Sequence, residues 1–553
     1  MFPFIVLCLA GVAALWVVRK RPASRPRAPL PPGPQGIPLL GNINELAPKD
    51  DTPRWKFWRD SLAQYGPVSS LNVFGQTIII LNDVEAAVDI LDRKGSVTQF
   101  DTDLTMPKMC GWGEARPHPG DLGHWKGVRS NLKREMGTKQ AVSRLHPLID
   151  RTTRQLLWHL LEAPDNIRDH IGRDAAGFFL NLGYGYNMAP RDHLTGKEDP
   201  FYELTRKANS LFWEIFSRQD WIVNQIPLLQ YLPACFPGAE FARKAKEIKG
   251  SIEEIKVLGL KVVQKMARDQ TTLQPSMLAR LLQDGAPEPG SEREAAMMWS
   301  PLELYLGGNE AVSRFESAIV QPKVTDEPAR QAVATFNSIL IAMALHPHVQ
   351  RKAQDELDRV VGPDALPGFQ HRASLPYINA ILRETLRWHP PALIPPPHVS
   401  NADLMWNGYL LPKGSYLLAN IGAFTQNAAL YKDPTTFDPV RFLARGPDSQ
   451  SHTPEPDIQK FIFGFGRRVC PGRFLADEML FLFTAQVLAC FNIAPKVPGT
   501  SEPKWLAGII SQPGPFDLSI EPRSRQHEVL IREAGKETLA TAQDAEELAK
   551  LAV

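Results

Sequence analysis

Hydrophobic residues recur at helical spacing along most of the chain. Three clear examples are 85–95 (EAAVDILDRKG), 349–362 (VQRKAQDELDRVVG) and 376–391 (PYINAILRETLRWHPP). Apolar positions three or four residues apart predict amphipathic helices. The first two segments stop at a glycine and the third at Pro390 and Pro391, which are common helix ends. The pattern therefore predicts that helices dominate the fold.

Shorter runs rich in β-branched and aromatic residues interrupt these helices. They are 68–81 (VSSLNVFGQTIIIL), 405–421 (MWNGYLLPKGSYLLANI) and 516–520 (FDLSI). Such runs, separated by Gly or Asn-Gly turns, predict strands and hairpins. We therefore expect a mainly α fold with small β-sheets.

The N-terminus has the pattern of a membrane anchor. Residues 2–18 carry no charge, and a basic stretch follows at once. This length is at the short end of what spans a bilayer, and the basic flank predicts a cytosolic orientation. A cleaved secretory signal is the alternative, because AGVAA resembles a cleavage site, but such a signal carries its charges before the apolar core. Residues 19–45 are basic and proline-rich and predict a stiff, extended hinge.

Composition and charge exclude several classes of function. The chain has 553 residues, a net charge of +2 and 22% charged residues. A nucleic-acid partner would leave a basic footprint, and none is present. No linker divides residues 46–525, which predicts one large domain, and residues 526–553 form a charged tail. The five cysteines stand at 8, 110, 235, 470 and 490, without the paired spacing of zinc sites or disulfide frameworks.

One of these cysteines stands in an unusual setting. Cys470 lies between arginines and glycines, in FGFGRRVCPGRF, just before an apolar helical run. Neighbouring guanidinium groups and a helix N-terminus favour a thiolate. The alternative is a small buried hydrophobe, which is how free cysteine usually behaves and how we interpret the other four.

Two further motifs carry charge. Glu384 and Arg387 in RETLR are three residues apart on one helical face and can form an ion pair. Arg441 follows a proline turn in FDPVRF. Taken alone, an ExxR pair is most often a surface salt bridge of little energetic value.

Together these motifs resemble the cytochrome P450 superfamily across nearly the whole chain. The order is an anchor, a proline hinge, HWKGVR, RETLR, DPVRF and FGFGRRVCPG. The cysteine stretch fits the FxxGxRxCxG signature of the family at Phe463, Gly466, Arg468, Cys470 and Gly472. The stretch from 375 to 414 resembles the fungal secondary-metabolism branch, of the O-methylsterigmatocystin oxidoreductase type.

The resemblance implies a haem b cofactor with Cys470 as the axial ligand of the iron, which favours O–O cleavage. Gly466 and Gly472 would let the backbone approach the sulfur, and Phe463 would shield that face of the ring. The predicted partners of the two haem propionates are Trp125, Arg129, His398 and Arg468. The alternatives are a loop role for His398 and core packing for Trp125. Glu384, Arg387 and Arg441 would form a structural triad that holds the loop beneath the haem.

The oxygen-activating helix departs from the family pattern. LYLGGNEA ends at Ala311, and the register resumes only at Ala332. We interpret residues 312–331 as an insertion foreign to this helix, either a translated intron or a loop broken by Pro322 and Pro328.

Joining Ala311 to Ala332 restores the register but places alanine where the family carries two threonines. The family threonine assists proton delivery, so an alanine removes a hydroxyl. Glu310 keeps the acidic position and is the predicted catalytic group.

The resemblance also places a substrate pocket. Its predicted lining residues are Ala392, Leu393, Ile394, Ile509 and Ile510. They are apolar, which fits a lipophilic substrate delivered from the membrane, although ordinary core packing explains them equally well.

The leading hypothesis is a membrane-anchored monooxygenase on the cytosolic face of the endoplasmic reticulum. It would oxidise a lipophilic small molecule with O2, in secondary metabolism or xenobiotic oxidation. Electrons would come from NADPH through a separate cytochrome P450 reductase, because the chain has no dinucleotide-binding GxGxxG motif. Arg467, Arg473, Lys126 and Lys133 are candidates for its docking face. The alternatives are a haem-thiolate isomerase or dehydratase, and a non-catalytic haem or ligand-binding protein disabled by the insertion.

Overall fold

The computed structural model describes residues 28–48, 50, 52–100, 104–112, 123–189, 198–216, 221–269, 275–312, 334–443, 456–506 and 511–539. The predicted anchor at 2–18 lies outside these ranges. Within them, no helix combines the length and the apolar character needed to cross a bilayer.

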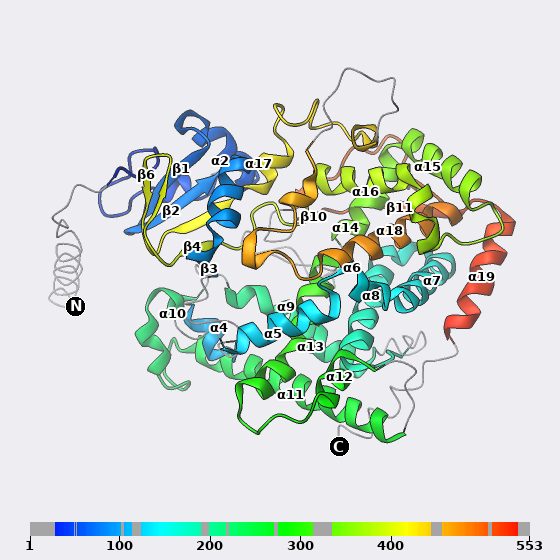
Figure 1. The fold of residues 1–553 in the computed structure, drawn as a ribbon, viewed down its shortest axis with the longest axis horizontal. Coiled ribbons are helices and arrows are strands. Elements are labelled where there is room, and N and C mark those ends of the chain that lie inside the picture. The colour runs from blue at the N-terminus through cyan, green and yellow to red at the C-terminus, as the bar shows by residue number, and fades with distance from the viewer. Residues whose placement is uncertain are drawn as a thin grey trace.

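Helices make up most of the described chain (Figure 1). They are α2 (Arg54–Leu62), α3 (Val84–Ala87), α4 (Thr105–Met109), α5 (Gly123–Met136), α6 (Lys139–Ser143), α7 (His146–Glu162), α8 (Ile167–Tyr184), α9 (Pro200–Phe216), α10 (Ile222–Gln225), α11 (Glu240–Asp269), α12 (Met277–Gln283), α13 (Glu292–Val312), α14 (Ala334–Leu345), α15 (Pro347–Val360), α16 (Pro376–Trp388), α17 (Ile421–Thr425), α18 (Arg473–Cys490) and α19 (Arg525–Leu539). The predicted helices at 349–362 and 376–391 are confirmed as α15 and α16. The segment 85–95 forms α3 followed by a π-helical turn, Val88–Arg93.

One five-stranded sheet, in the order β1-β2-β7-β4-β3, lies at the N-terminal end of the molecule. Its strands are β1 (Val68–Val73), β2 (Gln76–Leu81), β3 (Thr98–Phe100), β4 (His398–Ser400) and β7 (Tyr416–Ala419). β7 runs parallel to β2, and the other neighbours are antiparallel. The sheet thus joins segments more than 300 residues apart, which brings His398 beside the N-terminal strands.

Three two-stranded sheets complete the β structure of the described residues. They pair β5 (Leu404–Trp406) with β6 (Tyr409–Leu411), β8 (Phe491–Pro495) with β11 (Leu518–Pro522), and β9 (Trp505–Leu506) with β10 (Gln512–Pro513). The prediction of a mainly α fold with small sheets is confirmed.

Helix α13 runs through the helical core and packs closely on α5 and α8 (Figure 1). A Cβ added to Gly127 of α5 would lie 2.6 Å from Ala296, and one added to Gly308 would lie 2.3 Å from the ring of Phe179. Glycine therefore permits both close approaches. α13 ends at Val312, and the buried helix α14 begins at Ala334.

The proline-rich segment is more than a connector, because its described part is bound to the sheet. The Ser70 amide donates to the Pro32 carbonyl oxygen at 2.9 Å, and the Leu410 amide donates to the Pro29 carbonyl oxygen at 2.8 Å. The Asn42 amide donates to the Asn72 carbonyl oxygen at 2.6 Å. From Pro29 onward, the predicted hinge is therefore attached to strands of the described chain.

The first part of the predicted charged tail is a packed helix. α19 covers its first part and packs along α7. Ile531 is fully buried, and a Cβ on Gly535 would lie 2.5 Å from the Trp158 ring. Buried apolar residues spaced at helical intervals lie among the charges of this segment, Ile531 and Ala534 among them.

We predict that Gly535→Leu lowers the free energy of unfolding by about 1–3 kcal/mol, because the new side chain must displace Trp158. Glu533→Leu on the exposed side of α19 is the matched control and should change it by less than about 0.5 kcal/mol. Urea denaturation followed by circular dichroism measures both. Equal effects of the two variants would show that α19 does not pack as described.

Candidate active site

The loop before Cys470 is closed by one backbone hydrogen bond and two left-handed glycines. The Cys470 amide donates to the Phe463 carbonyl oxygen at 2.8 Å. Gly464 has φ +83° and Gly466 has φ +53°, a conformation that residues with a Cβ rarely adopt. A Cβ on Gly466 would also lie 2.6 Å from the Leu91 carbonyl oxygen. This position therefore accepts only glycine without strain.

Gly472 lies beside the sulfur without a special backbone conformation. Its φ is −86°, which any residue adopts, and it precedes α18 as the N-cap. An added Cβ would make ordinary contacts, 3.8 Å from Cys470 Sγ and 3.5 Å from Met136 Sδ. The left-handed turn at Gly466 is shared with Gly464, which we did not single out. The repeated Gly in FGFG is the sequence signal for it.

The protein alone does not favour the charged form of Cys470. Burial raises the pKa of the thiol, while the Gly472 backbone and the Arg129 and Arg473 guanidinium groups act in the opposite direction. The arginines act in the predicted direction, but burial outweighs them in the protein without a metal ion. A coordinated metal ion would deprotonate such a thiol outright.

Arg129 and Arg468 meet at Trp125, beside the cysteine loop. The Arg129 guanidinium carbon lies 5.8 Å from the centroid of the indole ring, and that of Arg468 lies 3.9 Å from it. Arg129 Nη2 donates to the Val469 carbonyl oxygen at 2.8 Å. The structure thus brings three of the four predicted propionate partners together, and Arg129 also ties α5 to the loop.

An acidic residue that we did not single out faces this cluster. Glu303 of α13 interacts electrostatically with Arg129, whose pKa is lowered chiefly by burial. A charged residue in the otherwise apolar segment before GGNEA is the sequence signal that could have identified it. Through Arg129, α13 is linked to the Cys470 loop.

His398, the fourth predicted partner, is neutral. It is buried on β4, and its Nδ1 lies 3.4 Å from Thr98 Oγ1 on β3. Burial, with the nearby Arg468 charge, lowers the pKa of His398 to about 4. Near neutral pH this side chain can therefore offer a hydrogen bond but no positive charge.

The structure brings the predicted triad together in the interior. Glu384 and Arg387 are fully buried, and two bonds of 2.7 and 2.8 Å join them. Arg441 Nε donates to the same carboxylate at 3.1 Å. Arg387 also donates to the carbonyl oxygens of Pro434 at 2.6 Å and Thr436 at 3.1 Å. The triad thereby fixes the segment that follows α17.

Only part of the predicted substrate pocket falls on described residues. Ala392, Leu393 and Ile394 are half-buried after α16, and the Leu393 carbonyl oxygen accepts a bond from the Gly422 amide at 3.1 Å. Residues 509 and 510 lie outside the described ranges. Glu310 lies on α13, but its side chain is outside the description.

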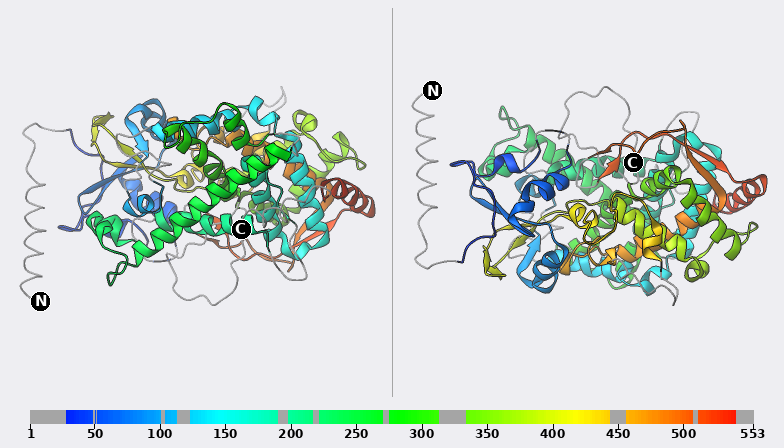
Figure 2. Two further views of the ribbon diagram at one scale, coloured as in Figure 1. Left: turned by 90° about the horizontal axis from the view of Figure 1, so that it is seen from below. Right: turned by 90° about the horizontal axis from the view of Figure 1, so that it is seen from above.

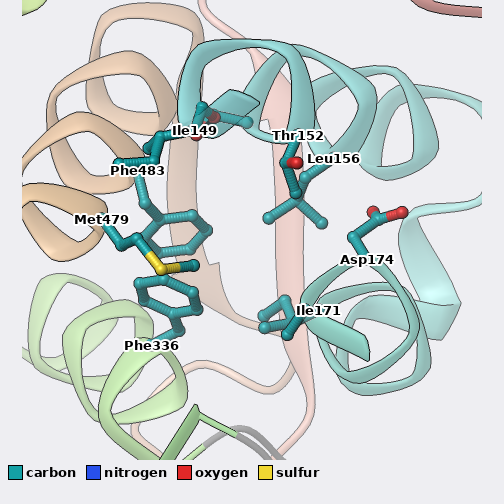
Figure 3. A pocket seen from close by; sticks show the side chains of 10 residues that line it. Ile149, Thr152, Leu156, Ile171, Asp174, Phe336, Met479 and Phe483 are labelled. Atoms are coloured by element: carbon teal, nitrogen blue, oxygen red, sulfur yellow. Dashed lines mark hydrogen bonds between the residues drawn. The ribbon is translucent and has the colours of Figure 1, made fainter. Parts of the chain in front are cut away.

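A separate small cavity lies between α7, α8, α14 and α18 (Figure 3). Its volume is about 20 Å³, room for about one water molecule. Phe336 and Phe483 stack on one side with ring centroids 4.0 Å apart, and Asp174 lies on the other. None of its lining residues was predicted, and it is too small for a substrate.

The donor set fits a haem. One sulfur in a rigid loop supplies an axial ligand, and paired guanidinium groups with an indole and an imidazole suit two carboxylates. Of the other described cysteines, Cys110 and Cys490 are buried in the apolar core and Cys235 is exposed. A mainly helical fold with this loop defines the haem-thiolate class of proteins.

Comparison with known proteins agrees with this class. The sequence model of the family described as cytochrome P450 matches residues 31–297 and 333–520. The chain is 43% identical to O-methylsterigmatocystin oxidoreductase of Aspergillus flavus over 530 residues, which cover 96% of this chain and 94% of that protein. It is 35% identical to cytochrome P450 monooxygenase ppsD of Aspergillus oryzae over 559 residues, 99% of both chains. The chain therefore belongs to the cytochrome P450 family and is a monooxygenase.

We predict that Glu384→Ala destabilises the fold by about 3–5 kcal/mol, because Arg387 is left buried without its partner. Arg383→Ala, on the exposed face of the same helix, is the control and should have little effect. The midpoint of urea unfolding measures both. A Glu384→Ala protein as stable as the control would contradict a structural role for the triad.

Proposed function

We propose that this monooxygenase is membrane-anchored, binds haem b through Cys470 and oxidises a lipophilic small molecule. The observation that carries the proposal is the Cys470 loop, fixed by Gly464 and Gly466 and tied to α5 through Arg129. When bound, the haem supplies the O2 activation that inserts one oxygen atom into the substrate and reduces the other to water.

The residues around the loop would then have distinct tasks. Arg129 and Arg468 would neutralise the propionates by charge-assisted bonds. His398 would donate a hydrogen bond to the same groups. Trp125 would keep the two guanidinium planes in place by cation–π contact. Glu310 is the proposed proton carrier on α13, in place of the threonine that the chain lacks.

Electrons would come from NADPH through a separate cytochrome P450 reductase. Basic residues flank the Cys470 loop: Lys126 and Lys133 on α5 and Arg467 in the loop are exposed, and Arg473 at the start of α18 is half-buried. A basic surface on this side suits an acidic protein partner. We propose it as the docking face.

Two groups of exposed apolar residues support membrane association at the endoplasmic reticulum. Leu39 is 61% exposed in the segment before α2, and Leu228 and Tyr231 after α10 are 76% and 78% exposed. Both segments lie at the end of the molecule where the described chain begins (Figure 2). Exposed apolar residues of this kind favour a lipid interface, which fits the single-pass anchor proposed at 2–18.

The substrate class follows from the pocket and the relatives. Ala392, Leu393 and Ile394 offer apolar contacts only, so the substrate would bind mainly by burial. The oxidoreductase from Aspergillus flavus is named for O-methylsterigmatocystin. We propose a lipophilic substrate of fungal secondary metabolism for this chain.

We further propose that the active protein lacks residues 312–331. The family match is interrupted between 297 and 333. α13 and α14 stand on either side of the segment, and joining Ala311 to Ala332 would give one helix in the family register. A spliced transcript that makes this junction would be the simplest source.

We predict that deleting residues 312–331 raises the fraction of purified protein that carries haem several-fold, because α13 then continues into α14. Replacing the segment by a Gly-Ser linker of equal length is the matched control and should give no gain. The test is the haem content per protein of the full chain, the deletion variant and the linker variant. The proposal fails if the full chain binds haem fully and the deletion loses it.

We predict that Cys470→Ala abolishes the red-shifted Soret band of the reduced, carbon-monoxide-bound protein, from which the family takes its name. Cys235→Ala, an exposed cysteine elsewhere, should keep it. An unchanged band in Cys470→Ala would show that another group binds the iron and would end the proposal.

A further inference from the structure

Helix α17 links the Cys470 loop to the predicted wall of the substrate pocket. Its Ile421 and Phe424 side chains are buried in the same apolar cluster as Phe461 and Phe465, which come shortly before Cys470 in the chain. The rings of Phe424 and Phe461 meet edge to face, with centroids 5.8 Å apart. One side of α17 is therefore packed against the segment that leads into the cysteine loop.

Gly422 of the same helix holds the pocket wall. Its amide donates to the Leu393 carbonyl oxygen at 3.1 Å. Further along the chain, His398 pairs with Leu417 of β7, the strand that leads into α17. The segment from Leu393 to His398 is thus attached at both ends to β7 and α17. Its position relative to the Cys470 loop therefore depends on where α17 lies.

The approach of α17 to α2 requires glycine at position 422. A Cβ added to Gly422 would lie 2.6 Å from Cδ2 and 2.7 Å from Cγ of the Trp55 ring in α2. Cγ is the ring atom nearest the main chain, so turning the ring about its own bond would not clear this contact. Asn420, the N-cap of α17, donates through Nδ2 to the Trp55 carbonyl oxygen at 2.8 Å. The two helices are thus joined through the backbone as well.

The far end of α17 is fixed to the end of α16. Arg387 Nη1 donates to the Thr425 carbonyl oxygen at 3.1 Å, and Gln426 Nε2 donates to the Trp388 carbonyl oxygen at 3.3 Å. Leu393, in contrast, is half-buried and lies outside any helix or strand. Its bond from the amide at position 422 is therefore the contact that gives way when a larger side chain displaces the start of α17.

We propose that Gly422 is a positioning residue for substrate binding. By fitting beneath Trp55, it keeps Leu393 and the pocket wall around it in a fixed position relative to the Cys470 loop. The proposal rests on the monooxygenase pocket proposed above. Gly422 acts on the substrate through Leu393, so a ligand that reaches the wall should sense a change at position 422, and a ligand too small to reach it should not.

A first test needs no haem. In Gly422→Ala the new methyl group displaces α17 from Leu393, so the amide at position 422 should exchange with deuterium about fivefold faster than in the unmodified full chain, after correction for the intrinsic rates. Mass spectrometry of the peptide that contains residues 420–425 measures this rate. Adding Trp55→Ala makes room for the methyl group and should return the rate to within about twofold of the original.

A second test reports the pocket. In spectral titrations of the haem-loaded protein, Gly422→Ala should weaken clotrimazole, an azole bulky enough to reach the pocket walls, by about tenfold. It should leave imidazole, which is too small to reach the wall, within about twofold. The double variant Gly422→Ala/Trp55→Ala should regain most of the clotrimazole affinity, and Trp55→Ala alone should change it by less than about threefold.

Two controls separate positioning from general effects of substitution. Gly250→Ala adds a methyl group on α11, where no described atom outside the helix backbone lies within 4 Å of the new Cβ. It should leave the exchange rate at position 422 and both azole affinities unchanged. Leu157→Ala, at a fully buried position of α7, should lower stability without changing the ratio of the two azole affinities.

Three results would overturn the proposal. They are unchanged exchange in Gly422→Ala, an unchanged ratio of azole affinities in that variant, and a loss that Trp55→Ala does not reverse. Absence of an azole spectrum in the unmodified chain would count against the proposed function alone, because the exchange test still decides whether Gly422 holds Leu393.

Discussion

The Cys470 loop is the constraint on which the rest of the site depends. The bond between the Cys470 amide and the Phe463 carbonyl oxygen closes the loop only because Gly464 and Gly466 adopt left-handed backbone conformations. With the loop closed, the carbonyl oxygen of Val469 is presented to Arg129 on α5. One turn thereby fixes both the position of the sulfur and the neighbouring cations.

The buried charges around this loop divide into two kinds. The Glu384–Arg387–Arg441 triad forms ion pairs within itself and hydrogen bonds to carbonyl oxygens. It therefore acts as scaffold. Arg129 and Arg468 instead converge on one indole ring, an arrangement suited to an anionic ligand. Since burial raises the pKa of Cys470 despite these cations, we attribute the thiolate to the metal ion that it would bind rather than to the loop.

The sequence predicted the parts of this account that depend on local pattern. Amphipathic spacing located α15 and α16, and the three-residue spacing of Glu384 and Arg387 predicted their pairing. The sequence did not predict the features that depend on tertiary contacts. The neutral state of His398 depends on its burial beside Thr98, from a strand 300 residues away, and the packing of α19 depends on the fit of Gly535 to Trp158. The left-handed conformation of Gly464 was not predicted, because residue identity alone does not reveal the sign of φ.

The most direct test of the central claim is the bond between sulfur and iron itself. Resonance Raman spectra of the ferric holoprotein should be compared between protein grown on natural sulfur and on the heavy isotope. If Cys470 ligates the iron, a low-frequency band of the iron–sulfur stretch shifts down with the heavier isotope. A haem-loaded protein whose spectrum contains no sulfur-sensitive band would contradict the account.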